Sequence, residues 1–213
     1  MHEVRGVRPD ARKRRHTVPT GVAIRDAREQ LFDAAERVLL RDGPSALSSR
    51  AVTTEAGCAK GVLHRHFDDF DAFLAELVRD RIARTDGRAA ELRDAAGTGT
   101  VVGHLTEALT ELFGPVAVAI VGLVTSRDEL RARLRRTTPA GIPLLTEAAA
   151  ALASYLAAER ELGRIAPDAD IDSLAPTLIG SGHLLFADRM GERPEGEAVR
   201  RVVAAVMGGI VRE

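Results

Sequence analysis

Apolar residues recur every three or four positions along most of the chain, which is the period of amphipathic α-helices. The first helical segment starts at Arg25, places Leu31 and Ala35 on one face, and ends before Gly43 and Pro44. No convincing period-two alternation of the kind that strands show is found along the 213 residues. The pattern therefore predicts an all-α protein of about ten helices.

Two short helices are predicted next. Ser48 is a favourable N-cap for a helix over 48–55, Gly57 marks a tight turn, and a third helix covers 59–66. A fourth helix begins near Asp69, where an acidic first turn suits the positive end of the helix dipole. Two short helices joined by a glycine turn have the size of a helix-turn-helix.

The rest of the chain also has a helical period. The stretch 116–124 is apolar on all sides and is expected to be buried. Ser126 and Glu129 form a capping-box pattern that predicts the start of a helix, and Asp170 is the expected cap of a later one. The predicted helices of this region cover 101–112, 116–124, 126–136, 144–163, 170–189 and 195–212.

Charge is divided unevenly along the chain. Residues 1–66 hold 13 Lys and Arg against 8 Asp and Glu, whereas residues 67–213 hold 17 against 23. A basic front and an acidic body suggest that only the front meets a polyanion, with a chance fluctuation as the alternative. Residues 1–24 are basic and aperiodic. We predict a flexible arm there, which is either a solvated tail or a DNA contact.

The composition argues against several classes of site. The single cysteine, Cys58, excludes an internal disulfide and a Cys-based zinc site; it is expected to pack as a small hydrophobe, with a redox role left open. His64 and His66 lie two positions apart on a helix, so they do not easily share one metal ion. Nucleophile-elbow and phosphate-loop motifs are absent. We therefore predict no catalytic residue, no metal site and no cofactor.

The composition of the chain is that of an ordinary globular protein, with 45% hydrophobic and 29% charged residues. No apolar run reaches the length of a membrane span, and the N-terminus lacks the apolar stretch of a signal peptide. Together with the single cysteine, these features predict a cytoplasmic protein without a membrane partner.

The stretch "AGCAKGVLHRHF", residues 56–67, has the features of a surface that lies against DNA. Ala59 and Gly61 are small enough for a close approach of the backbone, and Lys60 and Arg65 supply positive charge. The side chains expected to face inward and hold the helix are Leu63 and Phe67.

Residues 28–77 resemble the N-terminal domain of the tetracycline-repressor (TetR) family of bacterial transcriptional regulators. The shared features are an R-x-x-[IL]-[LF]-x-A-A start at Arg28, the Gly43 stop, a segment similar to A-G-V-S-K-G-T-L-Y-R-H-F, and an acidic, aromatic fourth helix. The resemblance implies a helix-turn-helix DNA-binding domain over 25–68 and a ligand-binding and dimerisation domain over 69–213.

The resemblance also implies which residues contact DNA. The DNA contacts that it favours most are Arg50, Ala59, Lys60, Gly61 and His64. The residues expected at the phosphate backbone are Ser48, Arg65 and His66, with a helix-surface charge and a packing residue as the alternatives for the last two. The chain departs from the family pattern where His64 replaces a usual tyrosine, Phe70 a usual lysine, Thr53 a usual alanine and Cys58 a usual valine.

For the body, the resemblance implies a homodimer with a small-molecule site in each subunit. The helices over 170–190 and 195–212 are expected to form the dimer contact, or alternatively only the core of one chain. The helices from 101 to about 160 are expected to line a mainly apolar pocket for a hydrophobic effector. The candidate ligand contacts, each of which also fits a core position, are His104, Phe113, Ile120, Thr125, Tyr155 and His183.

The sequence therefore predicts a regulator, most simply a repressor that a small hydrophobic ligand releases from a palindromic operator. The effector is expected to move the fourth helix and to swing the two DNA-binding domains out of register. Two other classes stay open, namely a helical ligand carrier with a degenerate DNA-binding domain and an enzyme with an unrecognised site.

Overall fold

The computed structural model describes residues 21–138, 140–187 and 193–212, and within these ranges the chain is all-α, as predicted. The described residues form ten α-helices and one 3₁₀ turn. They contain no β-strand, and their one isolated bridge pairs Ile165 with Val211. Most of the predicted arm, residues 1–20, lies outside the described residues.

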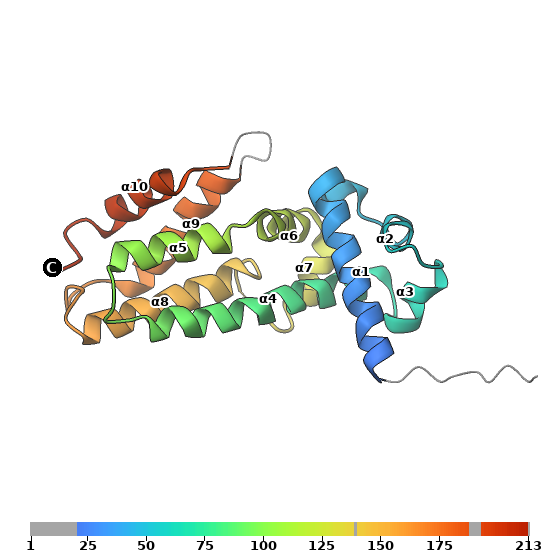
Figure 1. Cartoon of the computed structure of the whole chain (residues 1–213), viewed down its shortest axis with the longest axis horizontal. Helices are drawn as coiled ribbons and strands as arrows, with labels where there is room; N and C mark the ends of the chain where they lie inside the picture. The colour runs from blue at the N-terminus through green and yellow to red at the C-terminus, as the bar shows by residue number, and fades with distance from the viewer. Residues whose placement is uncertain (1–20, 139, 188–192, 213) are drawn as a thin grey trace, which may run out of the picture.

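The helices form two parts that α4 joins. In Figure 1, α1, α2 and α3 lie at one end of an elongated molecule, and α4 runs from this end into a body that also contains α5, α8, α9 and α10. The elements in chain order are α1 (Gly21–Asp42), η1 (Pro44–Ala46), α2 (Ser49–Glu55), α3 (Gly61–His66), α4 (Phe70–Asp94), α5 (Val101–Leu112), α6 (Pro115–Ser126), α7 (Asp128–Leu134), α8 (Leu145–Glu161), α9 (Ile171–Phe186) and α10 (Gly196–Met207).

Side-chain caps confirm three of the predicted helix starts. Ser48 accepts a hydrogen bond from the backbone N–H of Ala51 at the start of α2. Asp69 and Asp170 cap α4 and α9 in the same way, each through a backbone N–H three residues ahead. Each cap satisfies a donor that the first turn of a helix leaves without a partner.

The predicted capping box at Ser126 is wrong. Helix α6 continues through Ser126, so the backbone of this residue is helical rather than extended as an N-cap requires. Its hydroxyl donates to the carbonyl of Leu123 instead. Arg127 has the extended backbone that separates α6 from α7, and α7 begins at Asp128.

Two hydrophobic cores hold the molecule together, and they do not divide at residue 68. The first core combines α1, α2, α3 and the start of α4 with α6 and α7, and it includes Leu63, Phe73 and Ile120. The second core combines α5, α8, α9 and α10 around Leu109 and Leu156. Helices α6 and α7 of the body are therefore packed directly against the N-terminal helices.

Within the described ranges, no single helix is long and apolar enough to cross a membrane. Helices α5 and α6 pass that test only when taken together, and they bend by 63° at their junction.

Candidate DNA-binding surface and body cavity

Helix α3 is fixed by two buried side chains on its inner side. Leu63 is fully buried, and Phe67, which directly follows the helix, is 6% exposed. The ring of Phe67 lies 5.9 Å from that of Phe32 on α1 and 5.0 Å from that of Phe73 on α4, measured between centroids. Both side chains face inward, as the sequence predicts, and they attach α3 to the two longest helices of the N-terminal part.

The turn between α2 and α3 depends on glycine. Gly57 has a φ of +65°, a left-handed conformation that side chains with a Cβ rarely adopt. Cys58 follows it, donates its backbone N–H to the carbonyl of Thr53 at 3.0 Å, and packs half-buried against the first core. The hydroxyl of Thr53, which is itself buried, donates to the carbonyl of Ser49. Both departures from the family pattern thus fit this turn.

The outer side of α3 is a surface of small and basic residues. We call it the α3 face and define it by Ala59, Lys60, Gly61, His64 and Arg65, all of which are exposed. A Cβ added to Gly61 would have no neighbour within 4 Å, so packing inside this chain does not require glycine there.

The other three predicted DNA contacts lie beside this segment. Ser48 and Arg50, at the start of α2, are exposed. His66 is half-buried, with its ring 6.5 Å from that of Phe67, a position that agrees with the packing alternative. Among the described residues, no group of three or more His, Cys, Asp or Glu is placed to hold a metal ion.

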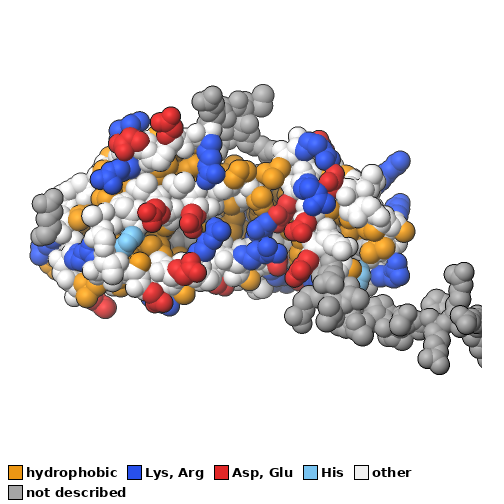
Figure 2. Space-filling model, viewed as in Figure 1, with side chains coloured by type: hydrophobic (Ala, Val, Ile, Leu, Met, Phe, Trp, Pro, Cys, Tyr) orange, Lys and Arg blue, Asp and Glu red, His pale blue; other side chains and the backbone are white. Residues whose placement is uncertain are grey.

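The cations of this region fall into two groups. Arg37 and Arg41 on α1 each bind the carboxylate of Glu55 at 2.8 Å, and their hydrogen bonds, that of Arg37 first, lower the pKa of Glu55. The side chains of Lys60, Arg65 and Arg50, by contrast, form no ion pair or hydrogen bond with another described residue. Lys and Arg side chains project from this end of the molecule in Figure 2. The paired arginines fix α2 on α1, whereas the others keep their full capacity to bind an anion.

The helix-turn-helix formed by α2 and α3, with its unpaired basic outer face, lies within residues 31–77. These residues match the family model described as "Bacterial regulatory proteins, tetR family". The N-terminal domain belongs to the TetR family. The match lies inside the stretch 28–77 that resembles the family in its motifs. No curated protein sequence matches the chain.

Solved structures extend the likeness to the TetR-type body. The chain is similar to a TetR-family transcriptional regulator from Agrobacterium tumefaciens, with a TM-score of 0.69, 13% identity, and coverage of 89% of this chain and 100% of the other. The chain is also similar to the regulator FadR from Bacillus subtilis, in complex with stearoyl-CoA, with a TM-score of 0.64, 18% identity, and coverage of 85% of this chain and 98% of the other. A gamma-butyrolactone receptor, an ArpA-like protein, is similar with a TM-score of 0.60, 23% identity, and coverage of 88% of this chain and 89% of the other. At these identities the likeness establishes a shared fold.

Arg127 of the body contacts the N-terminal helices at several points. Arg127, between α6 and α7, donates a hydrogen bond at 2.8 Å to the carbonyl of Leu47, which directly precedes the cap of α2. Its guanidinium also lies 3.8 Å from the carboxylate of Asp71 and 5.6 Å from the ring centroid of Phe70, both in the first turn of α4. Arg127 therefore touches the two segments that bracket the helix-turn-helix.

This contact gives Phe70 a structural role. The ring of Phe70 stacks on that of Phe73 at 5.7 Å and lies under Arg127, where a lysine would place two cations together. The neighbouring cap residue, Asp69, also binds Arg133 of α7 at 2.8 Å. The backbone N–H of the first turn, and then Arg133, lower the pKa of the Asp69 carboxyl. The start of α4 is thus attached to α7 at two points.

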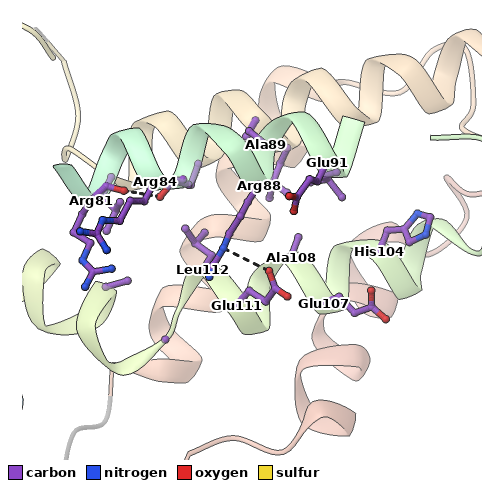
Figure 3. Close-up of a pocket in the computed structure, with 18 of the residues that line it drawn as sticks. Arg81, Arg84, Arg88, Ala89, Glu91, His104, Glu107, Ala108, Glu111 and Leu112 are labelled. Carbon is purple, nitrogen blue, oxygen red and sulfur yellow. Dashed lines mark hydrogen bonds and ion pairs between the residues drawn. The ribbon is translucent and has the colours of Figure 1, made fainter. Parts of the chain in front are cut away.

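A cavity of about 570 Å³ lies between α4, α5, α6 and α8, within the size range of small-molecule sites (Figure 3). Its lining is mostly apolar, with several alanines and the side chains of Leu92, Leu112 and Leu152. Its polar lining residues are Arg81, Arg84, Thr85, Arg88, Glu91, His104, Glu107 and Glu111. The body therefore offers a predominantly apolar space, as the sequence predicts, but with more charged residues around it than the sequence indicates.

Of the six predicted ligand contacts, one lines this cavity, namely His104. Phe113 is buried and stacks on Phe186, and His183 lies beside its ring. Ile120 is fully buried in the first core, and Thr125 is exposed and bonds carbonyls of its own helix. Phe113, Ile120 and His183 therefore pack against other side chains, Thr125 is exposed at the end of α6, and Tyr155 belongs to the buried network described next.

Tyr155 links the cavity to a buried carboxylate. Its hydroxyl donates to Glu159, which is 0% exposed, at 2.7 Å, and Nδ1 of His104 lies 3.0 Å from the same hydroxyl. Burial, followed by the hydrogen bond to Glu159, raises the pKa of Tyr155 well above its ordinary value. Glu159 also pairs with Arg164 at 3.4 Å. The sequence signal for this network was the i, i+4 spacing of tyrosine and glutamate on one helix.

The arginines of the cavity were missed from the sequence. Arg81, Arg84 and Arg88 are spaced three and four positions apart, so α4 places them along one side of the helix. Such a stripe usually indicates a solvated face. Here it borders a cavity that α5, α6 and α8 also line.

The outer surface of α9 and α10 is partly apolar. Several residues of the two helices predicted to form the dimer contact are buried within the chain, since Leu178, Phe186 and Val203 belong to the second core. Leu184 on α9, by contrast, is 79% exposed. Val206 on α10 is half-buried.

Proposed function

We propose that this protein is a DNA-binding transcriptional regulator, a repressor that a small, largely hydrophobic ligand releases from a palindromic operator. The α3 face carries this proposal. It is an outward helix surface with Lys60 and Arg65 unpaired, held in place by buried Leu63 and Phe67. A recognition helix needs this combination, because its N-terminal residues must reach base edges while the domain keeps a fixed angle.

The proposed operator contacts are those that the family resemblance implies. Small residues at the start of α3 favour close approach to the major groove, and the cations favour the phosphates. The proposed contacts are Ser48, Arg50, Ala59, Lys60, Gly61, His64, Arg65 and His66.

A homodimer is part of the proposal. Two-fold symmetry pairs two α3 faces with two half-sites about one DNA turn apart, or slightly more. The exposed Leu184 on α9 supports a contact between copies at this helix, because a leucine with 79% exposure gains from burial against a partner. Replacing Leu184 with glutamate is expected to shift the protein toward monomer in analytical ultracentrifugation, and an unchanged association constant would contradict this dimer surface.

The test of the proposed function starts from the DNA itself. Genomic fragments that the protein retains in a pull-down should share a two-fold-symmetric motif, and a duplex carrying it should shift in a native gel. Lys60→Ala is expected to weaken this complex by about 1–3 kcal/mol if Lys60 contacts a base. Arg93→Ala, at the exposed far end of α4, is the matched control and should bind as wild type. Retention of no preferred sequence would contradict the proposal.

Ligand release is measured on the same duplex. Coupling between effector and operator is typically about 1–3 kcal/mol, which corresponds to about 5- to 150-fold weaker DNA binding. If small molecules that occupy the cavity leave operator affinity unchanged, the protein is a constitutive DNA binder.

A further inference from the structure

The charges around the cavity are sorted by sign. In Figure 3, Arg81 and Arg84 lie at one end of the cavity, Glu107 and His104 lie at the other, and Arg88 points across toward Glu111 between them. A cavity with a basic end and an acidic end orients a charged ligand, because each end attracts one sign and repels the other.

At the basic end, Arg81 is shared with the DNA-binding domain. Its guanidinium binds the carboxylate of Glu36 on α1 through two nitrogens. Glu36 is only 8% exposed, and among the described residues Arg81 is the one cation that pairs with it. Arg81 therefore contacts the cavity on one side and the first helix of the TetR-family domain on the other.

The other two arginines have hydrogen-bond donors to spare. Arg84 binds Asp80 through Nε at 2.8 Å, which leaves both terminal nitrogens without a described partner. Arg88 approaches Glu111 only to 3.9 Å, longer than a hydrogen bond, and both side chains are more than half exposed. A guanidinium has five N–H donors in a fixed fork that matches a carboxylate or a phosphate. The basic end thus retains unused donors of the kind that bind oxyanions.

The apolar part of the lining continues from this end. Val116, Ala117 and Leu144 lie in the same lining as the arginines, and Ala148 and Leu152 extend it along α8. An apolar chain attached to an anionic group therefore finds burial beyond the arginines and avoids the carboxylates at the far end.

We propose that the cavity binds an amphipathic anion, with its carboxylate or phosphate group on Arg81 and Arg84 and its apolar part along α6 and α8, and that this group competes with Glu36 for Arg81. The inference rests on the proposed function, since it names the class of effector. When Arg81 turns to the ligand, the nearly buried Glu36 loses its charge partner. Because a nearly buried carboxylate is costly without a charge partner, α1 shifts toward water and moves α3, which the contact between Phe67 and Phe32 holds against α1.

Matched probes that differ only in charge test this proposal. Fluorescence titration measures the affinity of the protein for dansyl-labelled undecanoic acid and for its methyl ester. In a second titration, dodecyl phosphate and dodecanol are compared as competitors of the labelled acid. The acid is expected to bind about tenfold more tightly than the ester, as charge-assisted hydrogen bonds imply. The phosphate should displace the acid at concentrations where the alcohol does not. Equal affinities within each pair would overturn the proposal.

Three variants assign the effect to residues. Arg84→Ala should weaken binding of the acid about tenfold and leave the ester unchanged. Glu36→Gln, which removes the competitor but keeps the shape, should tighten binding of the acid about threefold or more, with thermal unfolding measured to verify the fold. Arg93→Ala should leave the affinities for the acid and for the ester unchanged. A loss of affinity that is equal for acid and ester in Arg84→Ala would contradict the anion site.

The DNA readout separates this inference from the proposed function. The acid is expected to release the wild-type protein from its operator duplex, and the ester at equal concentration is not. If the duplex is bound without probe and the ester releases it as well as the acid, the proposed function stands and the anion site is refuted. If no duplex is bound specifically in the absence of probe, the proposed function itself fails.

Discussion

Replacing Arg127 with leucine is expected to loosen the body from the DNA-binding domain. The guanidinium of Arg127 makes three contacts across this boundary, at 2.8 Å to the carbonyl of Leu47, at 3.8 Å to Asp71 and at 5.6 Å to the ring of Phe70. A leucine side chain keeps part of the apolar stem of arginine but makes none of these three contacts. The change therefore tests whether this residue couples the two parts.

The size of the effect follows from the contacts. A hydrogen bond from a charged donor contributes about 1.5–3 kcal/mol, and its removal leaves the carbonyl of the buried Leu47 without this donor. The ion pair with Asp71 is partly exposed and long, so it adds about 0–1 kcal/mol. The stacking over Phe70 adds about 0.5–1 kcal/mol. Because one group makes all three contacts, we expect a net decrease in stability of about 2–3 kcal/mol rather than their sum.

Thermal unfolding measures this decrease. For a chain of this length, about 2–3 kcal/mol corresponds to a fall in Tm of about 5–10 °C. Arg131→Leu is the matched control, because Arg131 on the neighbouring helix pairs only with the highly exposed Asp128 among the described residues, and it should shift stability by less than about 0.5 kcal/mol. The effector should also release Arg127→Leu from DNA less completely than wild type. A melting curve indistinguishable from that of wild type would refute the reasoning.

Three further predictions concern packing and ionisation. Leu63→Ala should lower the free energy of unfolding by about 3 kcal/mol in urea titrations, because it leaves a cavity under α3; a decrease below about 1 kcal/mol would contradict its buried position. Gly182→Ala should cost about 1–3 kcal/mol, since the new Cβ would lie 2.5 Å from a ring carbon of Phe113, whereas Gly87→Ala, with open space around it, should be neutral or stabilising; equal effects would exclude the close contact. Burial and its hydrogen bond raise the pKa of Tyr155, so stability should fall once pH exceeds the ordinary tyrosine value of about 10, where only the unfolded chain ionises. As this is the only tyrosine and tryptophan is absent, phenolate absorbance should appear only on unfolding, and ionisation at an ordinary pKa in the folded protein would contradict this.

The N-terminal half of the fold was predictable because its signals are local. Ser48 and Asp69 cap their helices with side chains that act within three residues, and Gly57 supplies a backbone conformation that other residues rarely adopt. Leu63 and Phe67 stand on the inner side of α3 by periodicity alone. Such features depend little on the rest of the chain.

The sequence predictions failed where contacts between distant segments determine a helix end or the lining of the cavity. Ser126 fits a capping box, but α6 extends through it, and the position of that helix end depends on packing against α1. The cavity is a space between four helices, so no periodicity indicates which side of α4 borders it or that Arg81 lies there. The role of Phe70 could not be predicted, because it depends on Arg127, which is 57 positions later in the sequence and lies above the ring of Phe70.

The salt dependence of operator binding tests the α3 face most directly. Removing Arg50, Lys60 and Arg65 together should weaken binding at low salt at least about 100-fold, and should flatten the slope of log affinity against log salt by about one unit for each DNA phosphate that is no longer neutralised. The control removes three exposed arginines of the body: Arg93, Arg160 and Arg212. Our account predicts a lower affinity and a flatter slope for the first variant alone. Wild-type affinity and slope in both variants would contradict it.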